Sequence, residues 1–288
     1  MLIAGFPAGS FATNCYVVAP GPGEECLIID PGQDAEPGVT ELLAEYRLRP
    51  VAVLATHGHV DHIWSVAPVC DARGIPAYIH PADRDLLSDP AKGFPLQVGQ
   101  QLFRGLTFTE PDDVVALTDG ITLRLAGVEL RVDHAPGHTP GSVTFRTAAA
   151  AADATKSRGP LGQWGVPGGS PPRARTADAT KSRGPLGQRG VPEGSPPRAS
   201  SVLFSGDLLF AGSIGRTDLP GGDYPTILDS LSRVCLTLPD DTRVLPGHGP
   251  QTTIGAERAT NPFLAGLARA PGPSPRPAPA AGPKRPGL

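Results

Sequence analysis

Short apolar runs alternate with amphipathic stretches along most of the chain. The segments at 14–19 and 25–30 have the β-branched and apolar content of strands, and the "PGPGE" between them is typical of a hairpin turn. Across 39–46 the apolar residues recur at helical spacing, and Pro50 is expected to end that helix. The pattern therefore switches from strand to helix within the first 50 residues.

The next element is the apolar run "VAVLA" at 51–55, which predicts a short strand buried on both faces. A helix is expected over 63–74, with Gly74 as its C-terminal stop. Further strands are expected at 76–80, 121–125, 128–134, 142–146, 201–205 and 242–246, and further helices at 225–238 and from about 253. Strands and helices mixed in this way indicate a layered α/β architecture in which helices cover sheets.

Two segments break this pattern. The stretch at 152–174 returns almost unchanged at 177–199, and both copies are rich in Gly and Pro with few apolar residues. Such units bury too little apolar surface to offset the entropy of ordering them. We therefore expect 148–200 to be a disordered, duplicated insertion between two neighbouring strands, and the Pro-rich tail at 270–288 to be disordered as well.

The remaining residues, 1–147 and 201–269, are expected to form one domain. The formal charge of the chain is −3; the net +5 of the insertion and +3 of the tail leave −11 for this domain. That charge argues against binding to nucleic acid. No apolar run approaches ~20 residues, so no membrane association is expected, and the absence of a signal-peptide pattern suggests a cytoplasmic protein.

Seven potential metal ligands follow the ends of expected strands, where ligands gather in layered α/β folds. Residues i and i+2 of an extended segment point the same way, so His57 and His59 can hold one ion, leaving Asp61 and His62 for a second. Five imidazoles and two carboxylates suit zinc, iron or manganese, and the lack of thiolate argues against a structural zinc site. The seven residues are His57, His59, Asp61, His62, His138, Asp207 and His248.

The motif "THGHVDH" at 56–62 is similar to the His-x-His-x-Asp-His signature of the metallo-β-lactamase superfamily. Within that superfamily the chain resembles most the glyoxalase II group, the hydroxyacylglutathione hydrolases, in their compact bacterial form. The resemblance implies an α/β fold of four layers, an αβ/βα sandwich. It extends through "LIIDPG" at 27–32, "APGHTPGS" at 135–142, "SGDLLFAGSIGRTDLPGGD" at 205–223 and "LPGHGPQTTIGAERATNPF" at 245–263.

The resemblance also implies how the ligands divide between two divalent ions, with zinc expected and iron or manganese as alternatives. One ion falls on His57, His59, His138 and Asp207, and the other on Asp61, His62, Asp207 and His248, so that Asp207 bridges them. Two such ions lower the pKa of a water molecule from about 15.7 towards neutrality, which supplies a metal-bound hydroxide as the nucleophile. Asp61 is the candidate catalytic residue, because it can accept a proton from that water.

The expected substrate is a small-molecule thioester, a 2-hydroxyacyl thiol ester, because a thiolate leaves without a separate general acid. Larger relatives hold glutathione with basic residues of a C-terminal helical domain, whereas only about 40 residues follow His248 here. The identity of the thiol therefore stays open. Arg216 is the candidate substrate-binding residue, through a bidentate contact with a carboxylate, or else it braces its own loop.

Other functions compete with the hydrolase. A persulfide dioxygenase of the same fold would hold one iron on histidines of this set and Asp207, and oxygen chemistry would replace hydrolysis. A β-lactamase is less favoured, because subclasses of those enzymes place cysteine or histidine where this chain keeps aspartate. A ribonuclease would need a basic surface. The non-enzymatic alternative is a metal-binding scaffold whose basic insertion recruits an acidic partner.

Overall fold

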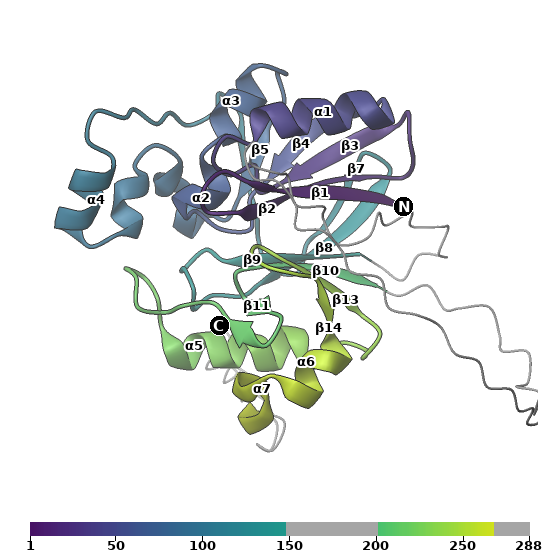
Figure 1. Ribbon diagram of the computed structural model, residues 1–288, viewed down its shortest axis with the longest axis vertical. Helices are drawn as coiled ribbons and strands as arrows, with labels where there is room; N and C mark the ends of the chain where they lie inside the picture. The colour runs from purple at the N-terminus through teal and green to yellow at the C-terminus, as the bar shows by residue number, and fades with distance from the viewer. Residues whose placement is uncertain (148–200, 268–288) are drawn as a thin grey trace, which may run out of the picture.

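The computed structural model describes residues 1–147 and 201–267, so the predictions made for the insertion and the tail lie outside the described residues. Two six-stranded sheets stack face to face in the centre of the molecule (Figure 1). The first sheet has the order β1-β2-β3-β4-β5-β6. Its strands are β1 (Leu2–Ala8), β2 (Thr13–Ala19), β3 (Glu25–Ile29), β4 (Arg49–Leu54), β5 (Ala77–Ile79) and β6 (Val114–Ala116).

The second sheet has the order β14-β13-β10-β9-β8-β7, and β11 pairs with β12 in a separate two-stranded ribbon. Its strands are β7 (Thr122–Leu125), β8 (Val128–His134), β9 (Val143–Thr147), β10 (Val202–Gly206), β13 (Arg243–Pro246) and β14 (Thr252–Thr253), while the ribbon is formed by β11 (Leu209–Phe210) and β12 (Ser213–Ile214). The predicted pairing of 142–146 with 201–205 is confirmed, since β9 and β10 run antiparallel side by side.

Helices cover the outer face of each sheet, which gives four layers (Figure 1). α1 (Glu36–Tyr46) and α3 (Val66–Asp71) cover the first sheet, and the helices after residue 223 cover the second. The latter are α5 (Tyr224–Ser230), which continues as a π-helical turn at Leu231–Cys235, α6 (Ile254–Thr260) and α7 (Pro262–Leu267). The short helices α2 (Val60–Ile63), η1 (Pro81–Leu87), η2 (Pro90–Gly93) and α4 (Leu96–Leu102) lie between β4 and β6 in the chain. The predicted αβ/βα sandwich is confirmed.

Strand β4 shows why the layers stack in this way. Val53 packs into the core beneath α1 and α3, whereas Ala52 and Leu54 pack into the core between the two sheets. Successive side chains of a strand point to opposite faces, so a continuous apolar run supplies both cores at once. Complete burial of a side chain such as Leu54 stabilises the fold by about 1.5–3 kcal/mol.

The end of α1 differs from the prediction. The helix ends at Tyr46, because Arg47 adopts the left-handed conformation (φ 55°) and its N–H donates to the carbonyl of Ala44. Pro50 lies beyond this point, within strand β4. A left-handed residue closes the last helical turn and redirects the chain, so Pro50 has no helix left to end.

The helix expected over 63–74 is also interrupted. It forms as α2 and α3, which are separated at Trp64 and Ser65. The N–H of Ser65 donates to the carbonyl of Pro31, and its hydroxyl donates to the carbonyl of Gly32. These bonds to a distant loop replace the helical bonds of that turn, and they anchor α2 beside β2 and β3. None of the helices within the described ranges has the length and apolarity needed to cross a membrane.

Candidate metal centre

Four strands deliver the seven predicted ligands to one edge of the sandwich. β4 leads into His57 and His59, and α2 directly after them carries Asp61 and His62. His138 lies in the loop between β8 and β9, and Asp207 and His248 follow β10 and β13. β10 and β13 are parallel neighbours, so their carboxyl ends meet at the same edge.

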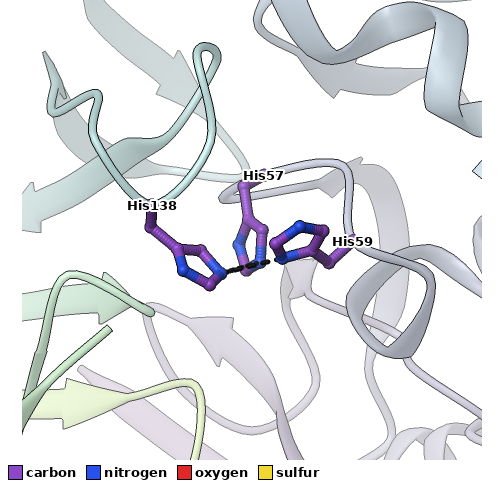
Figure 2. Close-up of side chains that lie close together, drawn as sticks. All are labelled: His57, His59 and His138. Atoms are coloured by element: carbon purple, nitrogen blue, oxygen red, sulfur yellow. Dashed lines mark hydrogen bonds between the residues drawn. The ribbon is translucent and has the colours of Figure 1, made fainter. Parts of the chain in front are cut away.

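Three histidines form the first ligand group. The Nδ1 of His59 lies 2.8 Å from the Nε2 of His138, which in turn lies 3.2 Å from the Nε2 of His57. Figure 2 shows the three rings converging, two from the loop after β4 and one from the loop after β8. All three side chains are buried, and the spacing of their nitrogens lets them hold a single metal ion.

A second group lies beside the first and consists of Asp61, His62 and His248. The Oδ2 of Asp61 lies 3.0 Å from the Nε2 of His248 and 3.5 Å from the Nε2 of His62. The hydroxyl of Thr13 also donates to this oxygen, at 3.1 Å. Thr13 was not among the predicted residues, because it lies 48 positions before Asp61 and no motif links the two.

Asp207 lies between the two groups. Its Oδ1 is 3.3 Å from the Nε2 of His62, and its Oδ2 is 3.5 Å from the Nε2 of His138 and 3.7 Å from the Nε2 of His248. One carboxylate therefore reaches histidines of both groups, as a bridging ligand must.

Two buried atoms in this centre favour a bound cation. The Nε2 of His62 and the Oδ1 of Asp207 face each other, and neither has a hydrogen-bond partner among the described residues. Buried polar atoms are almost always satisfied, so an unsatisfied nitrogen and oxygen side by side call for another partner. A divalent ion between them satisfies both, and imidazole and carboxylate are suitable ligands for it. The residues present thus fit a divalent metal.

Two histidines of the first group, His57 and His59, are held neutral. Burial lowers the pKa of His57 well below its usual value, and the surrounding imidazoles lower it further. Burial likewise lowers the pKa of His59 to about 3, with the neighbouring His138 acting in the same direction. Only a neutral imidazole binds a metal, so His57 and His59 do not need to release a proton before an ion binds.

The second group has the opposite electrostatics. Burial opposes protonation of His62, but Asp207, Asp61 and Asp30 together raise its pKa well above the usual value. Burial also opposes protonation of His248, but its hydrogen bond to Asp61 and the charge of Asp207 together raise its pKa. Burial acts to raise the pKa of Asp61, yet the neighbouring His62 and His248 hold it below its usual range. In the absence of metal this group is a set of ion pairs between histidines and aspartates, and a divalent cation would take the place of the protons on the histidines.

Hydrogen bonds on the far side of the rings fix which nitrogen faces the centre. The Nδ1–H of His62 donates to Asp30 at 2.9 Å, and the Nδ1 of His138 lies 2.7 Å from the carbonyl of Arg216. The Thr56 hydroxyl donates to Asp30 at 2.7 Å and lies 3.1 Å from the Nδ1 of His57. The rings of His57, His62 and His138 therefore turn Nε2 towards the centre, whereas His59 brings its Nδ1 close to His138. Asp30 thus orients the ring of His62.

Two further histidines and the predicted substrate-binding Arg216 lie apart from the seven ligands. His80 and His134 stack on each other, with ring centroids 4.2 Å apart, and belong to neither ligand group. The guanidinium of Arg216 makes two hydrogen bonds of 2.7 Å with Asp218 of its own loop. In this conformation Arg216 braces its loop. Asp83 was not predicted at all, although it is fully buried between two ligand-bearing loops.

Access to the centre is from one side. The side chains of Asp61, Asp207 and His248 are 18%, 11% and 30% exposed, whereas those of His57, His62 and His138 are buried. The ring of Phe210 lies edge-on to His248, with centroids 6.2 Å apart. The centre is therefore least shielded from solvent at Asp61 and His248.

Comparison with known proteins agrees with this geometry. Residues 8–189 and 198–248 match the sequence profile of the metallo-beta-lactamase superfamily. The chain belongs to this superfamily. The uncharacterized protein Rv2581c of Mycobacterium tuberculosis is 43% identical over 270 residues, 93% of this chain and all of that protein. The probable metallo-hydrolase YqgX of Bacillus subtilis is 31% identical, covering 91% of this chain and 96% of its own length.

Other superfamily relatives carry more specific descriptions. The hydroxyacylglutathione hydrolase GloC of Haemophilus influenzae is 28% identical, over 90% of this chain and 95% of GloC. The crystal structure of the B3 metallo-beta-lactamase BLEG-1 superposes with a TM-score of 0.65 at 35% identity, over 91% of this chain and 99% of that one. The di-iron-bound form of TTHA1623 gives 0.59 at 35% identity, over 89% and 97%.

Proposed function

We propose that this chain is a metal-dependent hydrolase that cleaves thioesters, and that its substrates are 2-hydroxyacyl thiol esters of the hydroxyacylglutathione type. The observation that carries the proposal is the position of Asp207 between two ligand groups. Two divalent ions would occupy the two groups, and zinc is the metal that we propose for both. A 35% identical relative solved in a di-iron-bound form supports two metal positions, and GloC supports the thioester.

Two divalent ions supply a water molecule of lowered pKa and polarise the carbonyl that it attacks. The chain's own residues set where this happens. The buried imidazoles of His57, His59 and His138 close one side of the centre, so the carbonyl would approach along the partly exposed side chains of Asp61 and His248. Hydrolysis adds water across the acyl–sulfur bond and releases a carboxylic acid and a thiol, and the thiolate needs no protein acid to leave.

Asp61 keeps the proposed role of proton acceptor, but its main role in this proposal is that of a metal ligand. Its carboxylate is ionised at neutral pH, because His62 and His248 lower its pKa. A carboxylate of such low pKa is a weak base, so it gives little driving force for proton transfer. We infer that Asp61 mainly holds the second ion and orients the water.

Arg216 is proposed to contact the substrate only by exchanging partners. A substrate carboxylate would have to replace Asp218, which is exposed and already bidentate. Measuring KM for an acidic and a neutral thioester with Arg216→Ala and Asp218→Ala tests this. Substrate binding predicts that Arg216→Ala raises KM for the acidic ester alone and that Asp218→Ala lowers it; equal effects on both esters mean that the pair only braces the loop.

Two other activities have support and belong in the same test. The 35% identical B3 metallo-beta-lactamase favours hydrolysis of a β-lactam, in which the same apparatus attacks an amide carbonyl. TTHA1623, 35% identical, was solved in a di-iron-bound form, so iron stays open as the metal, and the one-iron persulfide dioxygenase stays the competing activity from the sequence. A small-molecule substrate is the proposed partner; the exclusion of nucleic acid and membrane, and a cytoplasmic location, stay predictions from sequence.

The test is metal analysis of the purified protein together with a three-part activity panel. S-lactoylglutathione is assayed by release of free thiol, a chromogenic cephalosporin by absorbance, and glutathione persulfide by oxygen consumption. The chelated protein and the variant Asp207→Asn serve as controls, since both remove the bridge between the ligand groups. Metal-dependent thiol release supports the proposal. Oxygen consumption with one iron per chain, or turnover of the cephalosporin alone, would replace it.

A further inference from the structure

The short helix η1 carries one fully buried aspartate, Asp83, both of whose oxygens accept hydrogen bonds. Its Oδ2 accepts from the N–H of Gly58 at 2.8 Å and from the hydroxyl of Thr139 at 2.6 Å. Its Oδ1 accepts from the N–H of Gly141 at 2.7 Å. All three donors are neutral groups, and together they satisfy both oxygens of a buried carboxylate.

These donors belong to two different ligand-bearing loops. Gly58 lies between His57 and His59 in the loop after β4, and Thr139 directly follows His138 in the loop after β8. The two loops are about 80 positions apart in sequence, and each supplies part of the three-histidine group. One carboxylate therefore ties together the two segments whose separation sets the geometry of that group.

The backbones of both loops pack closely against Asp83. A Cβ on Gly141 would lie 2.5 Å from the carboxyl carbon of Asp83, and a Cβ on Gly58 would lie 2.9 Å from its backbone oxygen. Thr139 is held in turn by Ser142, whose hydroxyl lies 2.7 Å from its own and accepts from its N–H. Close approach of the backbone to Asp83 is thus required at both glycines.

We propose that Asp83 is a positioning residue of the metal centre, which holds the His57–His59 loop and the His138 loop at the separation that one ion needs. Metal–ligand distances are specified to within about 0.2 Å, so the affinity for an ion depends on how firmly the two loops are fixed relative to each other. The proposal rests on the metal-binding part of the proposed function and is independent of the substrate.

An amide cannot replace this carboxylate. Asn has one acceptor oxygen and one donating nitrogen, and whichever way it turns, the nitrogen faces a donor: the Gly141 N–H on one side, or the Gly58 N–H and Thr139 hydroxyl on the other. Asp83→Asn therefore keeps the shape of the side chain and opens the clamp. The matched control is Asp85→Asn in the same helix, because Asp85 is exposed and pairs with Lys92 at the surface.

The experiment titrates chelated protein with Co²⁺ and follows both affinity, by chelator competition, and the visible absorption of the bound ion. Asp83→Asn is expected to weaken binding at the three-histidine position about 10–100-fold and to change its spectrum, as loss of outer hydrogen-bond partners does. Asp85→Asn is expected to match the unaltered protein. Urea unfolding of the metal-free forms, measured in parallel, separates binding from stability.

The proposal is overturned if Asp83→Asn lowers the stability of the metal-free form but has the same Co²⁺ affinity and the same Co²⁺ spectrum as Asp85→Asn. If Asp83→Asn does not fold, Thr139→Val decides, since it removes one donor and leaves the carboxylate satisfied by two. An intermediate loss of affinity supports the clamp, and unchanged affinity overturns it. An unaltered protein that binds no metal would overturn the proposed function as well.

Discussion

Gly247 offers a way to disturb the bridge between the ion positions without removing any ligand. It is buried in the loop that carries His248, directly beneath Asp207. A Cβ at this position would lie 2.3 Å from the Oδ1 of Asp207 and 2.6 Å from the Cε1 of His62, whereas contacts below 3.0 Å are essentially never seen. Gly247→Ala must therefore push these atoms apart by about 0.7 Å.

The displacement falls on Asp207 because Gly247 itself cannot retreat. Its N–H donates to the carbonyl of Gly206 at 2.8 Å, and its carbonyl accepts from the N–H of Asn14 at 2.7 Å. A shift of this size exceeds the tolerance of a metal–oxygen bond, about 0.2 Å, several-fold. We expect Gly247→Ala to lose at least about tenfold in affinity for the second ion, and overpacking to lower the free energy of unfolding by about 1–3 kcal/mol.

The assay counts bound ions per chain by mass spectrometry of the metals and measures their affinity by chelator competition. The control is Gly249→Ala, two residues further on, where a Cβ meets nothing within 4 Å but the backbone is left-handed (φ 74°). That control carries backbone strain of about 1–2 kcal/mol without the collision. The reasoning is refuted if Gly247→Ala binds both ions as tightly as the unaltered protein does.

Three more predictions follow from the centre and its surroundings. Lowering the pH from about 8 to about 6 is expected to release the ion at His62 and His248 first. The pKa values of these two histidines are raised, so protons compete with the ion there, whereas His57 and His59 stay neutral. Isothermal titration with zinc at several pH values checks the order of release. Chelation should lower the melting temperature, and excess ion at 100 times its Kd should restore about 2.7 kcal/mol; calorimetry showing no dependence on metal would contradict this. Deleting 149–199 should leave metal content and turnover unchanged, because the deletion joins the end of β9 to the start of β10, whereas Asp207 follows the other end of β10. A loss of metal content or turnover would show that the insertion reaches the centre.

The pattern of the sequence located many of the elements and a set of candidate ligands, because both are local or repeated signals. Period-two and period-3.6 spacing located most strands and helices, and the run "VAVLA" correctly indicated a strand buried on both faces. Where a distant partner decided the local structure, the pattern failed. Ser65 breaks a helix because a loop 33 residues earlier accepts its hydroxyl.

Sequence and tertiary structure thus determined different parts of this protein. The sequence by itself named the chemistry: five imidazoles and two carboxylates at strand ends, in a motif whose spacing suits metal. Only the tertiary structure placed Asp207 within reach of both groups, turned Arg216 towards Asp218, and put Asp83 between two ligand loops. The physical reason is that a ligand's identity is carried by its own side chain, whereas its position and pKa depend on neighbours that are adjacent only after folding.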